Sequence, residues 1–504
     1  MSRPYQYISE EQCDLAEPYA APMSESLRAF GYELPSAIAD LVDNSIFADA
    51  KTVWVDFAWN GEDSTICVTD DGKGMTEEEL VNAMRPGSRN PLESRDPKDL
   101  GRYGLGLKTA SFSQCRRLVA RSKIPGGLPA TRCWDLDFVA YKNKWLLLRE
   151  AGEGSERHFT RLGKLSHGTT VLWEQMDRIV KGQAVDDEVH KRFFHGRIEA
   201  VERHLAMVFH RFLEGKRRLR IFVNANEVEP WDPFLKSEKA TQQIADERIS
   251  LFQRQVGVIP YVLPHISKLT AEKHERAAGL KGWNLQQGFY VYRNERLLVP
   301  GDWLGLPFAK EEHFKLARIQ LDIPNSMDQE WDIDVTKSKA RPPDALRNEL
   351  RYIAGVTRKR ASEVYRHRGK VLARKTSQEF VFVWQQVSRR GKFLYRVNRE
   401  HPLVQQALKA EGKLLEPLLR MIEETVPVPL LAITNSEHPD KHSAPFEDAP
   451  VREILALLRR VYEAMIDSKI SRPTVIERLR VMEPFDRFPE LVESFKEETH
   501  KRQL

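Results

Sequence analysis

The stretch that most constrains the fold runs from Glu33 to Ser111, because it holds three short motifs in order. They read ELPSAIADLVDNSIFADA, VTDDGKGM and GRYGLGLKTAS. The first predicts a helix, since buriable residues recur on one face at a period near 3.6. That face consists of Ile38, Leu41, Val42 and Ser45. Asp40 and Asn44 are four residues apart and share the opposite face, so the helix is expected to offer a carboxylate beside an amide.

The second and third motifs place acids and glycines where a chain can approach an anionic ligand. A strand-like run over 64–69 ends in Asp70, which is followed by Gly72 and Gly74. Three further glycines precede a helix-like run from about residue 107, and a helix N-terminus after glycines favours phosphate. These glycines are Gly101, Gly104 and Gly106.

Each motif alone has an ordinary interpretation: a solvated polar pair, a turn and a loop-to-helix junction. Together, in this order, they resemble the GHKL ATPase superfamily. That superfamily includes gyrase B subunits, MutL, heat-shock-90 chaperones, MORC proteins and sensor histidine kinases. The chain is most similar to bacterial MORC/MutL-like and heat-shock-90-like ATP-binding proteins. The resemblance covers about residues 30–343 and implies the Bergerat fold.

The resemblance assigns a role to each matching residue. Asn44 corresponds to the Mg²⁺ ligand, an oxygen donor suited to a hard cation, and Asp70 to the acid that binds the adenine amino group. Thr169, in the run GTTV, corresponds to the threonine that supports this acid. The remaining implied contacts to ATP are Gly72, Gly74, Met75, the lid glycines Gly101, Gly104 and Gly106, and Lys108.

One departure from the family pattern concerns the general base. Family ATPases usually carry a glutamate four residues before the magnesium asparagine, whereas this chain has Asp40. Aspartate is one methylene shorter, and a displacement of about 1 Å can cost roughly 100-fold in rate. Hydrolysis with Asp40 as the base is therefore expected to be slow. Asp43 is a weaker candidate, because relatives with the glutamate also carry an aspartate there.

The predicted fold class is α/β (α+β), with a Bergerat-type sandwich of helices on a mixed sheet. We expect an N-terminal arm (1–32), the ATPase domain (33–185), a transducer-like α/β domain (186–343) and a basic, mainly helical C-terminal region (344–504). Residues 85–100 are expected to form a lid. A capping box is expected at Thr76 and Glu79, a strand over 144–149, and a turn between strands at Asn294 and Glu295. A broken or frayed helix is expected over 190–213, with the break at Gly196. A transducer lysine that senses the γ-phosphate is assigned to Lys337, with Lys339 as the second candidate. The alternative is a solvated lysine at a strand end.

A basic run follows the transducer-like region. Residues 347–375 carry ten Lys or Arg against two acids. Such a run is often a solvated face, but this imbalance favours contacts to the DNA backbone through Arg358, Lys359 and Arg360.

The leading functional hypothesis is a DNA-associated, ATP-hydrolysing clamp that closes as a homodimer when ATP and Mg²⁺ bind. A restriction, antiviral-defence or DNA-repair system, with a nuclease or other defence partner, is the expected setting. The alternatives are a heat-shock-90-like protein-remodelling chaperone and a non-hydrolysing ATP-gated switch. The sequence contains no apolar run of 18 residues, so no membrane-spanning helix is predicted. Four scattered cysteines without metal-site spacing fit the cytoplasm.

Overall fold

The structure is a computed structural model that describes most of the chain. The described residues are 13–14, 16–29, 31–87, 106–180, 182–215, 218–244, 246–251, 254–324, 327, 330–332, 340–366, 383–389, 392–428, 430–431, 446, 449–480, 482, 484–485 and 488–501. The chain divides into two compact units, residues 1–365 and 366–504. Gly101, Gly104, Lys337, Lys339 and most of the predicted lid lie outside the described residues.

A seven-stranded mixed sheet forms the first domain, in the order β4-β3-β5-β2-β1-β6-β7. Neighbouring strands are antiparallel except β1 and β6, which are parallel. The strands are β1 (Thr52–Ala58), β2 (Thr65–Asp70), β3 (Arg117–Lys123), β4 (Ala130–Asp135), β5 (Gly168–Glu174), β6 (Arg220–Val223) and β7 (Asn226–Glu227). The predicted strand over 144–149 is reduced to one bridge, between Leu148 and Cys133.

Strand β2 is buried along its whole length because both faces of the sheet are covered. Ile66 and Val68 belong to the main core, whereas Cys67 lies in a small second core with Phe159 and Leu172. This alternation follows the two-residue period of a strand. The last residue of β2 is Asp70, so the central strand delivers this carboxylate to the sheet edge.

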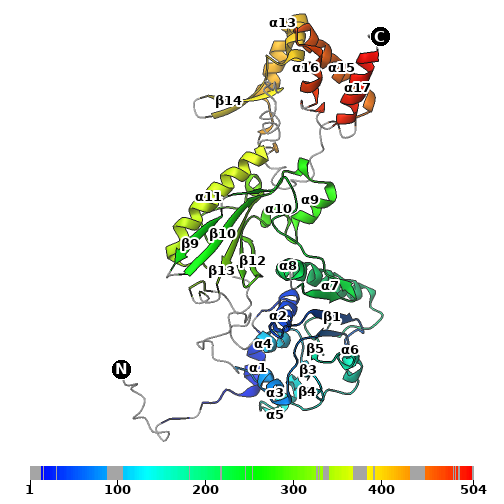
Figure 1. Cartoon of the computed structure of the whole chain (residues 1–504), viewed down its shortest axis with the longest axis vertical. Helices are drawn as coiled ribbons and strands as arrows, with labels where there is room; N and C mark the ends of the chain where they lie inside the picture. The colour runs from blue at the N-terminus through cyan, green and yellow to red at the C-terminus, as the bar shows by residue number, and fades with distance from the viewer. Residues whose placement is uncertain are drawn as a thin grey trace. The chain divides into compact units, whose positions relative to one another are not determined.

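The helices of the first domain gather mainly on one face of this sheet (Figure 1). They are α1 (Ala20–Arg28), α2 (Leu34–Phe47), α3 (Glu77–Met84), α4 (Gly106–Phe112), α5 (Leu136–Lys142), α7 (Glu188–Val208) and α8 (His210–Glu214). A short 3₁₀ turn, η3 (Ser155–Phe159), and α6 (Thr160–Lys164) accompany the second core. The capping box predicted at Thr76 and Glu79 is present. The break predicted at Gly196 is wrong: α7 runs through Gly196 and ends at Val208, after which Phe209 leaves helical geometry.

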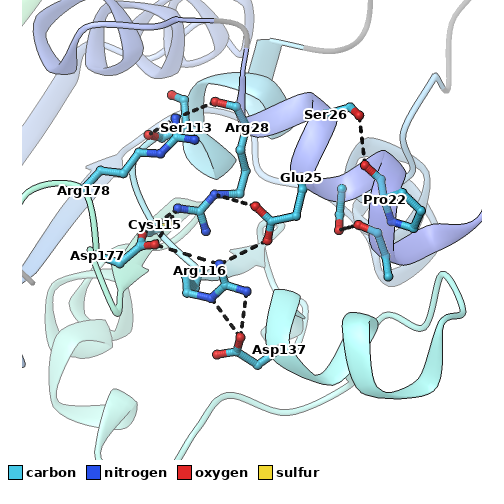
Figure 2. A network of polar contacts seen from close by, with 12 residues as sticks. Pro22, Glu25, Ser26, Arg28, Ser113, Cys115, Arg116, Asp137, Asp177 and Arg178 are labelled. Carbon is cyan, nitrogen blue, oxygen red and sulfur yellow. Dashed lines mark hydrogen bonds and ion pairs between the residues drawn. The ribbon is translucent and has the colours of Figure 1, made fainter.

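Helix α1 docks on its own domain rather than forming a free arm. Figure 2 shows the network of charges that holds it. Arg28 donates to both oxygens of Asp177, at 2.6 and 2.8 Å. Glu25 pairs with Arg116, which also binds Asp137. Residues 20–28 of the predicted arm therefore belong to the body of the first domain.

The first sheet extends past the boundary predicted at residue 185. Strand β6 pairs with β1 in parallel, from Thr52 opposite Arg220 to Val55 opposite Val223. The main core likewise continues to Phe234. A local reading misses this because a parallel neighbour is set by a long crossover, here through α7 and α8.

A six-stranded sheet forms the second domain, in the order β12-β11-β13-β10-β8, with β9 also pairing with β10. Its strands are β8 (Gln242–Gln243), β9 (Glu247–Leu251), β10 (Arg254–Val262), β11 (Gly288–Arg293), β12 (Arg296–Asp302) and β13 (Ala317–Ile323). Short helices α9 (Ala271–Ala278) and α10 (Gly282–Leu285) and 3₁₀ turns η4 (Ile266–Lys268) and η5 (Glu312–Phe314) complete it. The predicted turn at Asn294 and Glu295 joins β11 to β12.

Helix α11 (Asp344–Arg366) packs along this second sheet (Figure 1). Its apolar face joins the core of the second domain through Leu346, Leu350, Ile353, Ala354 and Ala361. The predicted boundary at 343 is therefore displaced as well, because α11 up to Tyr365 belongs to the first compact unit.

The unit of residues 366–504 is mainly helical, as predicted, and it also contains a two-stranded sheet. Its elements are β14 (Trp384–Arg389), β15 (Lys392–Val397), α13 (Pro402–Glu424), α15 (Val451–Asp467), α16 (Arg472–Leu479) and α17 (Pro489–Lys501). The last three helices share one core, which includes Leu458, Leu479 and Phe495. Among the described residues, none of the helices combines the length and apolar character that a membrane span requires.

Candidate active site

Asp70 sits at the end of β2 with both carboxylate oxygens bound. Its Oδ2 accepts a hydrogen bond from Ser45 Oγ of α2 at 2.9 Å, and its Oδ1 accepts one from the Gly72 amide at 2.9 Å. In the sheet it lies between Val53 and Thr169. The strand, the helix and the following loop therefore fix one buried carboxylate.

The environment of Asp70 changes its protonation. Burial raises its pKa from 3.8 to about 6. The Gly72 amide and the Ser45 hydroxyl oppose this shift by donating to the ionised form, as does the Thr169 amide. A carboxylate that is 7% exposed and only partly compensated gains from one more donor, such as an exocyclic amine.

The loop after Asp70 runs so close to neighbouring backbone that several of its positions accept only glycine. Gly74 has φ +71°, and a Cβ there would lie 2.0 Å from the Lys123 carbonyl oxygen. Gly168, with φ +143°, approaches the Asp70 carbonyl so closely that a Cβ would lie at 2.1 Å. At Gly72 a Cβ would meet the Ala48 Cβ at 2.7 Å. The predicted glycines thus have a steric reason independent of any ligand.

Ser122 of β3 ties the other predicted residues of this loop together. Its Oγ accepts from the Met75 amide at 2.8 Å and lies 2.8 Å from the Thr169 hydroxyl. The Thr169 hydroxyl thus contacts Ser122, while its amide is the group that affects Asp70. His167 Nδ1 lies 2.6 Å from the Gly72 carbonyl oxygen. The loop is consequently anchored on Ser122 of β3 and on His167, which directly precedes β5.

Asp40 and Asn44 lie in very different surroundings, although both are on α2. Asn44 is exposed, whereas Asp40 is only 3% exposed. Asp40 Oδ2 accepts a hydrogen bond from the Tyr32 hydroxyl at 2.8 Å. Burial and the Asp40 charge raise the pKa of Tyr32, so the hydroxyl stays protonated and donates. The predicted carboxylate and amide therefore lie on the same helix, but only the amide of Asn44 is open to solvent.

The neighbouring Asp43 is held by an arginine of the second domain. Arg296 Nε lies 2.8 Å from each oxygen of Asp43, and both side chains are almost fully buried. Arg296 Nη2 lies 3.8 Å from Asp40 Oδ1. One guanidinium therefore serves two carboxylates of α2, and it engages Asp43 by direct hydrogen bonds.

The described part of the third motif approaches the same helix. Gly106 begins α4, and a Cβ on it would lie 3.3 Å from Asp40 Oδ2. Lys108 is buried, and its Nζ donates to the Ala83 carbonyl at 2.9 Å. The structure thus places Asp40 and Gly106 side by side, with Lys108 on the same short helix.

The predicted DNA contacts on α11 separate into two kinds. Arg358 is only 8% exposed; it donates to the Ala309 carbonyl and lies over the rings of Trp303 and Phe314. Its assignment to a nucleic-acid surface is therefore wrong, because its side chain is occupied in packing. Lys359 and Arg360 are exposed. Among residues 344–365 of α11, the charged side chains left wholly or partly exposed are Arg347, Arg351, Lys359 and Arg360 against Asp344, Glu349 and Glu363.

Sequence reasoning missed several residues of this site. Ser45 follows Asn44 directly and was placed among the packing residues, although its hydroxyl binds Asp70. Ser122 and Tyr32 have no local signal, because only the pairing of β3 and the start of α2 bring them close. Arg296 is separated from Asp43 by 253 positions, and nothing near either residue connects them.

Comparisons with known proteins agree with this geometry. A family model described as "Histidine kinase-, DNA gyrase B-, and HSP90-like ATPase" matches residues 32–169. The protein named ATPase morc-1 from Caenorhabditis elegans is 37% identical over 95 residues, 19% of this chain and 11% of that protein.

Two further relatives match over similarly short stretches. DNA mismatch repair protein MutL from Dictyoglomus turgidum is 36% identical over 92 residues, 18% of this chain and 16% of MutL. MORC family CW-type zinc finger protein 3 from Mus musculus is 32% identical over 79 residues, 15% of this chain and 8% of that protein. The matches thus span between 8 and 16% of these relatives, and the likeness concerns one domain.

Proposed function

We propose that the protein binds ATP with Mg²⁺ and hydrolyses it to close a homodimer on DNA, because residues 32–169 match the family model of histidine kinase-, DNA gyrase B- and HSP90-like ATPases. The observation that carries the nucleotide part is the Asp70 carboxylate, buried at the end of β2 and supported by Ser45 and the Gly72 amide. Its raised pKa leaves room for a further donor, which the adenine amino group supplies.

The other assignments follow from the resemblance, and the local geometry supports those of Met75, Thr169 and Asn44. Met75 and Thr169 line the adenine side through their shared partner Ser122. The lid glycines, Lys108 and Lys337 contact the phosphates in this proposal. Asn44 is the chain's ligand for Mg²⁺, and its exposed amide suits an ion that takes few protein ligands. When bound, the ion neutralises phosphate charge.

Asp40 is the proposed general base, and it takes a proton from the attacking water at its carboxylate. The hydrogen bond from Tyr32 and the nearby Arg296 stabilise the ionised carboxylate needed for this role. The same contacts restrict the side chain, which is one methylene shorter than glutamate. Turnover should therefore be slow.

The nucleotide part is tested with purified full-length protein and ATP. We expect Asp70→Ala to lose ATP binding and Asn44→Ala to lose Mg²⁺-dependent binding. Asp40→Ala should bind ATP but lose turnover. Calorimetry and a phosphate-release assay measure the two properties separately. ATP binding that is unchanged in Asp70→Ala would remove the central assignment.

Closure of the homodimer on DNA is supported by the resemblance to MutL and MORC proteins and by the exposed basic side chains of α11. Its test reverses Arg351, Lys359 and Arg360 to glutamate and leaves the buried Arg358 intact. Retention of the protein on closed circular DNA with a non-hydrolysable ATP analogue should fall, while ATP binding stays normal. Unchanged retention would favour the chaperone alternative, in which the clients are polypeptides.

A second candidate function is an ATP-gated switch that does not turn over. The enclosed position of Asp40, 3% exposed and bonded to Tyr32, is the observation that favours it. Steady-state hydrolysis by wild type and Asp40→Glu decides between the two. Turnover in wild type supports the enzyme, whereas activity that appears only in Asp40→Glu supports the switch.

A further inference from the structure

The second domain reaches α2 through the tip of the β11–β12 hairpin. Asn294 and Glu295 both have positive φ, +47° and +67°, as a tight two-residue turn requires. On one side of the turn, Tyr292 Oη lies 2.8 Å from Nε2 of His210 on α8. On the other, Leu297 joins the core of the first domain. The hairpin tip is therefore seated in the ATPase domain.

Arg296 is the charged residue at this seat. Besides its two contacts to Asp43, its Nη1 donates to the Leu297 carbonyl at 3.3 Å. Its guanidinium carbon lies 5.8 Å from the centre of the Phe209 ring. A planar cation fixed on several sides imposes an orientation on its partners, which a flexible ammonium does not.

The pair Asp43 and Asp40 shares this cation unequally. Asp43 takes the hydrogen bonds, while Asp40 lies within electrostatic reach of Nη2 at 3.8 Å and accepts the Tyr32 hydroxyl. Buried carboxylates need such compensation. Arg296 thus acts on Asp40 through its positive charge, while its direct hydrogen bonds go to Asp43.

We propose that Arg296 is a positioning residue: through it the second domain orients Asp40, so ATP turnover requires the seated hairpin. This inference rests on the proposed role of Asp40 as the general base. It differs from the sensing role given to Lys337, because Arg296 acts on the carboxylates of α2.

A merely structural ion pair can be replaced by a neutral pair, and this difference provides the test. The variant Arg296→Met with Asp43→Asn removes both charges and leaves no unpaired ion. We expect ATP binding within about 3-fold of wild type, while kcat falls by about 10-fold or more, since small misplacements of a base are costly. Arg296→Lys should restore only part of kcat.

The matched control lies at the same contact between the first and second domains. Arg211 of α8 binds Asp322 and Glu295 of the second domain and lies over the Tyr292 ring. The variant Arg211→Met with Asp322→Asn should keep kcat within about 2-fold of wild type. An equal loss of kcat in both double variants would show that general packing between the two domains causes the loss, and it would overturn the inference.

Two other outcomes separate this inference from the proposed function. If wild type turns ATP over and Arg296→Met with Asp43→Asn keeps the same kcat, the positioning role alone is overturned. If wild type binds ATP without turnover, the proposed hydrolysis is contradicted, and with it any role of Arg296 in orienting a base.

Discussion

Two carboxylates of the ATPase domain are held in opposite ways. Asp70 is fixed by Ser45 and the Gly72 amide, which lie close in the chain or on the adjacent helix of the same domain. Asp43 is paired with Arg296 from the sheet of the second domain, and the same guanidinium lies near Asp40. In the proposed function, the adenine side of the site is thus built locally, whereas the side proposed for catalysis depends on a distant element.

This difference separates binding from turnover. An ATPase domain with a self-contained adenine seat can bind nucleotide whatever the second domain does. A base that shares its cation with the second domain can act only when the two are joined. The comparison predicts that changes at the two sites affect stability, binding and turnover in different proportions.

The largest expected effect comes from breaking the distant side. Asp43→Ala leaves the Arg296 guanidinium buried without its hydrogen-bonded partner. We expect the free energy of unfolding to fall by about 3–5 kcal/mol. Urea unfolding followed by tryptophan fluorescence measures it. Adding Arg296→Met should recover most of the loss, and a double variant as unstable as Asp43→Ala would contradict the argument.

The local side is tested by the glycine that lets the adenine loop pass. Gly74→Ala would place a Cβ 2.0 Å from the Lys123 carbonyl, whereas Gly126 has the same φ and nothing within 4 Å. Gly126→Ala should cost about 1–2 kcal/mol of unfolding free energy. Gly74→Ala should cost more and abolish ATP binding. Equal costs, with binding preserved, would show that the loop yields easily.

Local features of the fold could be predicted from the sequence. The helix of Asp40, the strand ending at Asp70 and the capping box at Thr76 all depend on neighbours within a few residues. The turn at Asn294 and Glu295 belongs to the same class. The glycines of the adenine loop were also identified, because their conformation shows in the motif itself.

The features that could not be predicted depend on distant partners. Arg358 was assigned to a DNA surface from its basic neighbours, yet α11 turns it onto Trp303 and Phe314. The enclosure of Asp40 could not be predicted, because no local pattern indicates that Tyr32, Arg296 and Gly106 lie around it. The pairing of β6 with β1 extended the ATPase domain for the same reason.

A smaller effect is expected from pH, and it concerns the adenine side alone. Burial raises the pKa of Asp70 to about 6, so between pH 3.8 and 6 the folded protein binds more protons there than the unfolded chain. This group's contribution to stability is therefore present at low pH and lost as pH rises through 6. An adenine amino group favours the ionised form, so ATP affinity should fall as pH drops below about 6.

Calorimetry in buffers of different ionisation enthalpy checks this sign. Binding near pH 6 should release a fraction of a proton from Asp70, and binding at pH 8 almost none. The Asp70→Asn variant reports the protons that come from the nucleotide itself. Proton release that is identical in wild type and Asp70→Asn would show that Asp70 does not titrate on binding.

The smallest change sharpens the same measurement. Ser45→Ala removes the hydroxyl that donates to Asp70 Oδ2, and a hydrogen bond to an ionised group contributes about 1.5–3 kcal/mol. The pH midpoint of ATP affinity should rise by about one pH unit or more. Ser64→Ala is the matched control, since its hydroxyl donates to the Gly61 carbonyl, away from Asp70. If the pH midpoint of ATP affinity moves equally in both variants, Ser45 does not set the pKa of Asp70. The argument that the adenine side is built from local contacts would then fail.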